Sequence, residues 1–99
     1  MARFLLTNKA VEDLTNIWHY TIETWSENQA DKYYKSLIDS FQKITENPKI
    51  GRNYSNVENE LKGFNVNKHI VFYRKISDDV VEITRILHTM MDIKNKLKE

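Results

Sequence analysis

Cysteine is absent from this sequence of 99 residues, and it contains only one proline and two glycines. Without thiolates, three histidines are too few for the usual four-ligand structural zinc site. A secreted domain of this size would often need disulfide bonds, so a chain without cysteine fits a reducing compartment. We therefore expect a cytoplasmic protein with no metal and no cofactor.

An excess of either charge is also missing, since 15 basic and 14 acidic residues leave a formal net charge of +1. Broad, non-specific binding of nucleic acid needs a basic excess, so this balance argues against it. Basic and aromatic residues do alternate in the second half of the chain. On a sheet they would face either nucleic acid or, as an ordinary edge, solvent. They are Arg52, Tyr54, Lys62, Phe64, Lys68, Tyr73, Arg74, Lys75 and Arg85.

Long apolar runs are missing too. Phe4-Leu5-Leu6 is far too short for a signal peptide or a membrane span, so we expect no membrane partner. With 40% hydrophobic residues, the chain has enough apolar material for one ordered core. We expect residues 1–99 to form a single domain, with little room for a deep substrate cleft.

Two helices are predicted in the first half of the chain. Between residues 9 and 25, apolar side chains recur every three or four residues, which indicates an amphipathic helix preceded by a Thr7 or Asn8 cap. Ser26-Glu27-Asn28-Gln29 has the form of a capping box, so a second helix begins at once. It runs to about Asn47, because Pro48 cannot continue it. Two helices with almost no linker form an antiparallel hairpin.

The second half of the chain is predicted to be mostly strand. Residues 47–56 have the composition of a loop, and strands are expected at 4–6, 61–66, 69–75 and 80–87. Gly63 indicates a bulge or a close backbone approach. The tail from residue 90 is a short helix or a frayed end. The order β-α-α-β-β-β implies an α+β fold, with the helical hairpin packed on one face of a mainly antiparallel sheet.

The last strand contains one charged residue among apolar neighbours. The two-residue period of a strand puts Val81, Ile83, Arg85 and Leu87 on one face. Two interpretations of Arg85 remain open. Its stem lies along the sheet and carries the charge to water, or the charge is held in a concave binding surface.

No residue pattern in the sequence points to a self-sufficient catalytic site. His88 closes the last strand, where it either bonds to the backbone or acts as a general base, and nothing brings His19 or His69 near it. Glu12-Asp13 is interpreted as solvated helix surface. The serines lack a strained nucleophile turn, and there is no glycine-rich phosphate loop. The chain is therefore expected to act by binding other macromolecules.

Four segments are similar to one known family. The chain resembles the ParE branch of the ParE/RelE toxin superfamily, the toxin halves of bacterial type II toxin–antitoxin modules, over nearly its whole length. The segments are Leu6-Thr7-Asn8-Lys9-Ala10 with Asp13-Leu14, Glu46-Asn47-Pro48 with Gly51-Arg52, His69-Ile70-Val71-Phe72-Tyr73, and Arg85-Ile86-Leu87-His88-Thr89-Met90-Met91-Asp92. The resemblance implies the same β-α-α-β-β-β order.

The resemblance implies one of two activities. RelE-like members cleave mRNA in the ribosome with basic residues and often a C-terminal tyrosine, whereas ParE-like members block DNA gyrase by trapping it on cut DNA. This chain has Ile70 where the RelE pattern has an arginine. After the last strand, where the RelE pattern has further basic residues and a tyrosine, this chain has Thr89-Met90-Met91. RNA cleavage without metal needs groups that stabilise charge and transfer protons. A non-enzymatic gyrase inhibitor is therefore favoured.

Two alternatives remain beside gyrase inhibition. The first is a RelE-type mRNA interferase with a rearranged site, in which Arg74, Arg85 or His88 replaces the missing groups. The second is a module member that still binds its antitoxin but is no longer toxic.

The resemblance also implies two protein partners: a ParD-like antitoxin whose C-terminal segment wraps the toxin, and DNA gyrase, through its A subunit. We expect the antitoxin to bind apolar side chains left exposed on the helical hairpin and along the sheet edge. On the hairpin these are Trp18, Ile22, Trp25, Tyr34, Leu37 and Phe41. The expected target-binding residues are Arg52, Arg74, Arg85, His88, Met91 and Asp92. The toxin alone is not expected to bind specific DNA sequences; contact with DNA is made through the antitoxin.

Overall fold

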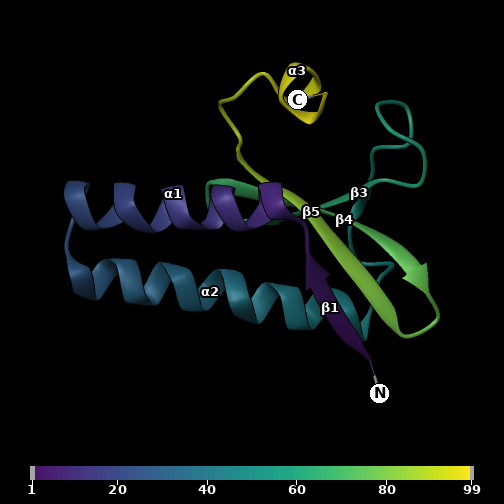
Figure 1. Cartoon of the computed structure of the whole chain (residues 1–99), viewed down its shortest axis with the longest axis horizontal. Coiled ribbons are helices and arrows are strands. Elements are labelled where there is room, and N and C mark those ends of the chain that lie inside the picture. Colours follow the sequence, from purple (N-terminus) through teal and green to yellow (C-terminus); the bar gives the residue numbers. More distant parts are fainter. Residues whose placement is uncertain (1, 99) are drawn as a thin grey trace.

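The computed structural model describes residues 2–98, in which a helical hairpin packs on one side of a five-stranded sheet and a short C-terminal helix lies apart from the hairpin (Figure 1). The elements are β1 (Arg3–Leu6), α1 (Asn8–Thr24), α2 (Glu27–Glu46), β2 (Arg52–Asn53), β3 (Lys62–Val66), β4 (His69–Ser77), β5 (Val80–His88) and α3 (Ile93–Leu97). The predicted α+β class and helical hairpin are confirmed. The short strand β2 falls in the stretch that was expected to be only a loop.

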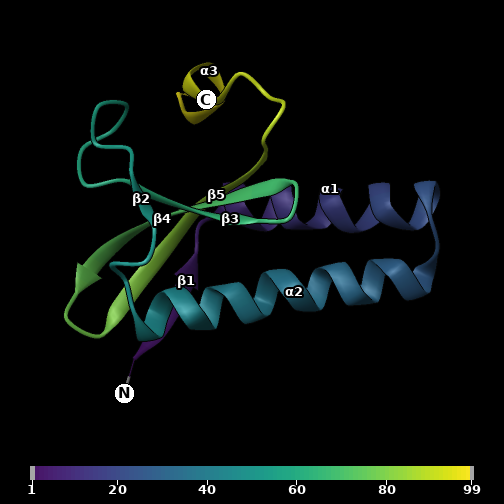
Figure 2. The same ribbon diagram turned by 180° about the vertical axis from the view of Figure 1, so that it is seen from behind.

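The strands are ordered β1-β5-β4-β3-β2 across the sheet. The four strands β2 to β5 pair antiparallel in chain order, whereas β1 pairs parallel with β5. The sheet is thus mainly antiparallel, as expected. Seen from behind, the long connection between β2 and β3 extends away from the two long helices (Figure 2).

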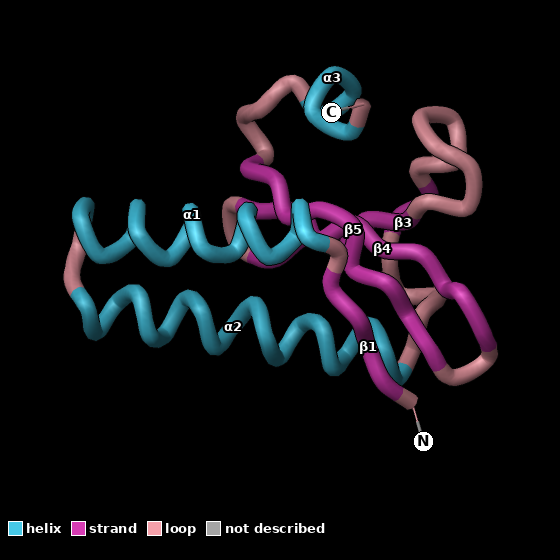
Figure 3. Tube along the Cα trace, viewed as in Figure 1, coloured by secondary structure: helices cyan, strands magenta, loops and turns pink. Residues whose placement is uncertain are grey.

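Both long helices begin at the predicted caps. Thr7 Oγ1 accepts a hydrogen bond from the Ala10 amide at 3.1 Å, and Ser26 Oγ accepts one from the Gln29 amide at 3.1 Å. These bonds satisfy amides that a helix leaves unpaired in its first turn. α2 ends at Glu46, just before Pro48. α2 begins at Glu27, directly after the end of α1 at Thr24, and the two helices run antiparallel side by side (Figure 3).

The sheet is buried on both faces. Toward the hairpin, Val71 and Tyr73 of β4 join a cluster that includes Leu37 and Phe41 of α2, all without exposed surface. Toward the other face, a second cluster is covered by residues of the β2–β3 connection and of α3. It comprises Leu61, Ile70, Phe72 and Leu87, with Tyr54, Ile93 and Leu97 packed against it. The apolar run in β4 therefore marks a central strand with both sides covered.

A β-bulge at Thr84 changes the face assignment in β5. Phe72 of β4 pairs with Arg85, but the next residue, Tyr73, pairs with Ile83, so Thr84 is an extra residue. The carbonyl of Thr84 accepts a hydrogen bond of 2.8 Å from the Thr7 hydroxyl. The expectation that Ile83 and Arg85 share a face is wrong, because a bulge shifts the alternation by one residue.

The connection after α2 is held by a buried phenol. The Tyr73 hydroxyl donates to the Pro48 carbonyl at 2.7 Å and accepts from the Gly51 amide at 2.9 Å.

Gly63 of β3 lies against the ring of Tyr54, because a Cβ added at Gly63 would lie only 2.7 Å from Cε2 of Tyr54. The predicted close approach at Gly63 is thus confirmed, and glycine is needed there for space.

Candidate functional site

Arg85 forms a nearly buried ion pair with Asp13 of α1. Its Nε donates to Asp13 Oδ2 at 2.8 Å and its Nη2 donates to Oδ1 at 3.1 Å. Only 12% of the Arg85 side chain and 14% of the Asp13 side chain are exposed. Both interpretations of Arg85 from the sequence are therefore wrong, as is the solvated Asp13. The bulge at Thr84 turns Arg85 away from the hairpin-facing core and toward its partner.

The same pair connects three elements. Asp13 Oδ2 also accepts from the backbone amide of Ile86 at 3.0 Å, and Arg85 Nη1 donates to the Lys96 carbonyl in α3 at 2.8 Å. β1 stops at Leu6, where it pairs with Ile83, so among the described residues the rest of β5 has no strand beside it on that edge. Asp13 supplies the acceptor that a neighbouring strand would have supplied.

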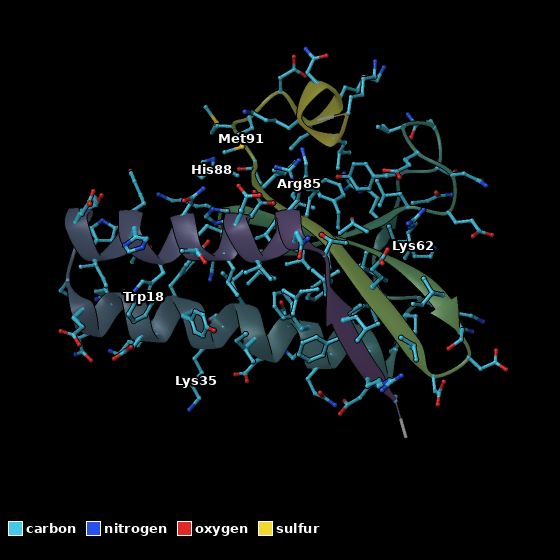
Figure 4. All side chains as sticks on the ribbon, viewed as in Figure 1. Trp18, Lys35, Lys62, Arg85, His88 and Met91 are labelled. Carbon is cyan, nitrogen blue, oxygen red and sulfur yellow. The ribbon has the colours of Figure 1, made fainter. Side chains whose placement is uncertain are left out.

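Beside this ion pair lies a groove of about 480 Å³, which we call the histidine groove. One wall is α1, and the other is formed by the ends of β4 and β5 with the segment that leads to α3. Its lining residues are Asp13, Asn16, Ile17, Tyr20, Thr21, Trp25, Tyr33, Lys68, His69, Ile86, His88, Met90 and Met91. Figure 4 shows His88 and Met91 close together near the connection to α3.

Two histidines and a tyrosine form a network in this groove. His69 and His88 are cross-strand partners, with ring centroids 5.2 Å apart. The Tyr33 hydroxyl bonds to His69 Nδ1, and the Met90 amide donates to His88 Nδ1 at 3.0 Å. The prediction that His88 bonds to the backbone is confirmed. The expectation that nothing brings His69 near His88 is wrong.

Burial changes the acidity of two groups in this network. Desolvation, with a smaller repulsion from His88, lowers the pKa of His69 to about 4, while the carboxylate of Asp13 opposes the shift. Desolvation also raises the pKa of Tyr33, partly offset by a hydrogen bond from the Lys68 backbone. At neutral pH, His69 is therefore an uncharged imidazole and Tyr33 an intact phenol.

A second groove of about 610 Å³, here called the outer groove, lies between α1 and α2. Its lining residues are Leu6, Val11, Leu14, Thr15, Trp18, Asp31, Tyr34 and Ile38. The rings of Trp18 and Tyr34 meet edge to face with centroids 5.7 Å apart. Trp18 lies between the two helices in Figure 4.

The six residues expected to bind the antitoxin fall into three groups. Trp18 and Tyr34 line the outer groove, and Ile22 is 36% exposed on the hairpin. Trp25 lines the histidine groove instead. Leu37 and Phe41 have no exposed surface and belong to the core, so their expected contact with an antitoxin is wrong. The helical stripe of α2 is continuous, and the sequence does not show which part of it the sheet covers.

The six residues expected to bind the target do not form one surface. His88 and Met91 line the histidine groove, and Asp92 caps α3 by accepting from the Asn95 amide. Arg74 is paired with Glu82 at 3.1 Å. Arg52 is exposed on β2, three strands from β5, which is roughly 14 Å at the usual strand spacing.

Besides His88, the polar residues that line the groove were not among the expected target-binding residues; those that carry its ion pair and hydrogen-bond network are Asp13, Tyr33 and His69. Within residues 2–98 there is no group of three or more His, Asp or Glu side chains placed to hold a metal ion. In the same range no helix is long and apolar enough to cross a membrane.

The architecture, with a helical hairpin on one face of a mainly antiparallel sheet and a short C-terminal helix, is that of a RelE/ParE-like domain. The chain belongs to the ParE toxin family of type II toxin–antitoxin systems, because residues 4–93 match the family model described as "ParE toxin of type II toxin-antitoxin system, parDE". This confirms the resemblance that was inferred from the four sequence segments.

Individual relatives agree with this assignment. The chain is 32% identical over 97 residues to Toxin ParE1 of Caulobacter vibrioides, covering 98% of this chain and 99% of the relative. It is 29% identical over 96 residues to Toxin ParE1 of Mycobacterium tuberculosis, covering 97% and 98%. A solved structure described as "Chromosomal ParDE TA system from P. aeruginosa" matches with a TM-score of 0.74 at 16% identity, covering 89% of this chain and 96% of that one. At 16% sequence identity, this likeness supports the fold alone.

Proposed function

We propose that this chain is a toxin that binds DNA gyrase and traps its cleaved complex with DNA, and that a ParD-like antitoxin neutralises it. Membership in the ParE toxin family supports this proposal. The observation that carries it is the engagement of Arg85, whose guanidinium is paired with Asp13 and bonded to α3. A charge held in this way is not available to stabilise a reacting phosphate, which favours action by binding over RNA cleavage.

We assign the antitoxin to the outer groove. Its aromatic pair Trp18–Tyr34 presents apolar surface between α1 and α2, and a groove of this kind suits an amphipathic helix. Ile22 extends this surface along α1. An antitoxin segment that is disordered when free would gain order by burying these side chains.

A supercoiling assay tests the proposed activity. Purified chain added to gyrase, relaxed plasmid and ATP is expected to inhibit supercoiling and to increase linear DNA after protein denaturation, and the co-produced antitoxin should prevent both effects. Tyr34→Ala is expected to leave inhibition intact but to weaken neutralisation. Lys35→Ala, on an exposed side chain that points away from the hairpin in Figure 4, is the matched control. Failure of wild-type chain to inhibit or to increase cleavage refutes the proposal.

One observation favours a second candidate function, a ribosome-dependent mRNA interferase. His69 and His88 lie side by side with a phenol, and paired imidazoles are the usual groups for proton transfer during RNA cleavage. This alternative predicts cuts in translated mRNA during induction of the chain alone, and their loss in His88→Ala. Growth arrest with intact mRNA and induction of a DNA-damage response excludes it.

A further inference from the structure

The imidazoles of the histidine groove have hydrogen-bonding capacity that the described chain does not use. His88 Nδ1 accepts from the Met90 amide, so in its neutral form the proton is on Nε2. The Tyr33 oxygen accepts from the Lys68 backbone, which directs the phenol proton to His69 Nδ1 and leaves the proton of His69 on Nε2 as well. Within residues 2–98, no protein acceptor is found for either Nε2–H.

The charges around these donors favour an anionic partner. Lys68 is exposed and lines the groove next to His69. The acidic residue of the groove is Asp13, and its carboxylate is already occupied by Arg85 and by the Ile86 amide. The Asp13 carboxylate still acts on His69, but it is engaged by Arg85, so Lys68 is the charged side chain lining the groove that is left to attract an anionic partner.

Exposed apolar side chains surround the donors. Met90 is 86% exposed, Tyr20 65%, Trp25 55% and Met91 44%. They come from α1, from its C-terminal cap and from the segment after β5. Aromatic and Met side chains grouped around a few polar groups are typical of protein-binding surfaces.

We propose that the histidine groove binds an acidic side chain on an apolar segment of the toxin's target protein, through the Nε2–H groups of His69 and His88 and the ammonium of Lys68. The inference rests on the proposed function, since it names the surface by which the toxin grips its target. The groove and the outer groove use different residues of α1, so target and antitoxin contact different faces of one helix. Tyr33 acts as a positioning residue, because it orients the ring of His69.

The test uses the full chain, with growth arrest after induction without antitoxin as a readout that does not depend on the identity of the target. His88→Leu and Lys68→Glu are expected to weaken growth arrest and gyrase inhibition roughly tenfold or more, the effect of losing hydrogen bonds to a charged group. His88→Gln, whose amide can replace the Nε2–H donor, should retain most of the activity. Lys35→Glu is the control for a change of charge on an exposed face away from the groove.

Circular dichroism and thermal unfolding of each variant separate loss of function from loss of fold. Folded His88→Leu and Lys68→Glu chains that arrest growth as the wild type does would overturn the inference, even if they bind antitoxin poorly, because the groove would then belong to the antitoxin. If the wild-type chain arrests growth without affecting gyrase, the proposed target is wrong. In that case the dependence of growth arrest on His88 and Lys68 still decides the role of the groove.

Discussion

The carboxylate of Asp13 holds Arg85 through both of its oxygens and holds the Ile86 amide through one of them. One side chain of α1 thereby completes the edge of β5 beyond the end of β1 and fixes the arginine that bonds to the Lys96 carbonyl of α3. The pair joins α1, β5 and α3, and residues of α1 and β5 line the histidine groove. The main role of the Asp13–Arg85 ion pair is therefore structural.

Asp13→Ala is expected to lower the free energy of unfolding by about 3 kcal/mol, because it leaves a nearly buried guanidinium without its counter-charge. The Ile86 amide also loses its acceptor. Urea unfolding followed by tryptophan fluorescence measures the change. Asp13→Asn retains an acceptor oxygen and should cost less. Equal stability of Asp13→Ala and wild type would show that the ion pair does not support the fold.

The helices and the central strand were predictable because their signals are local. Thr7 and Ser26 cap helices through bonds that span three residues, and Pro48 ends a helix wherever it occurs. The bulge at Thr84 was not predictable from local sequence, because the Thr7 hydroxyl that bonds to its carbonyl is 77 residues away in sequence. Asp13 was misassigned for the same reason, since its partner Arg85 is 72 residues away.

The histidine pair could have been found by counting. Ser77 and Val80 form the first cross-strand pair beside the turn between β4 and β5. His69 lies eight residues before Ser77, and His88 lies eight residues after Val80. An extra residue in each strand, near Ile76 in β4 and at Thr84 in β5, leaves the overall register unchanged. The tight turn therefore predicts that His69 faces His88. Nothing local predicts that Tyr33 of α2 reaches the same place.

Two aromatic residues of α2 are expected to respond in opposite ways to truncation. Phe41→Ala should lower the free energy of unfolding by about 3–5 kcal/mol, because Phe41 is fully buried against the sheet. Tyr34→Ala removes a ring that is 39% exposed and should cost much less stability, while it weakens antitoxin binding. Calorimetry of antitoxin titrated into each folded variant separates these effects. Normal antitoxin affinity in Tyr34→Ala would remove the outer groove as the antitoxin site.

Tyr73→Phe is expected to loosen the connection after α2 while leaving the core filled. The variant keeps the buried ring but loses the bonds from its hydroxyl to Pro48 and Gly51. Loss of two such bonds corresponds to about 1–3 kcal/mol. Amide hydrogen exchange should accelerate at Gly51 and its neighbours more than in β4. A uniform acceleration across the sheet would indicate instead that the hydroxyl supports the whole core.

Acidification is expected to destabilise the chain through His69. Its pKa is lowered to about 4 by burial, against an ordinary value of 6.5, so between these values the unfolded chain binds a proton that the folded chain does not. Stability from this group is complete above about pH 6.5, is lost as the pH falls toward 4, and changes no further below that. His88 and Asp13 are the neighbouring groups that modify the shift. Because His69 is only half-buried, solvent screening reduces the effect to about 1–2 kcal/mol.

His69→Gln provides the matched comparison for this pH dependence, since it removes the titrating group and keeps a polar side chain near Tyr33. Urea unfolding of both proteins at intervals from pH 7.5 to 4 measures the difference, and the other ionisable groups are common to both proteins. The gap in stability between wild type and His69→Gln should shift in favour of the variant as the pH falls below 6.5. A constant gap over this range would show that His69 is protonated as readily in the folded chain as in the unfolded one.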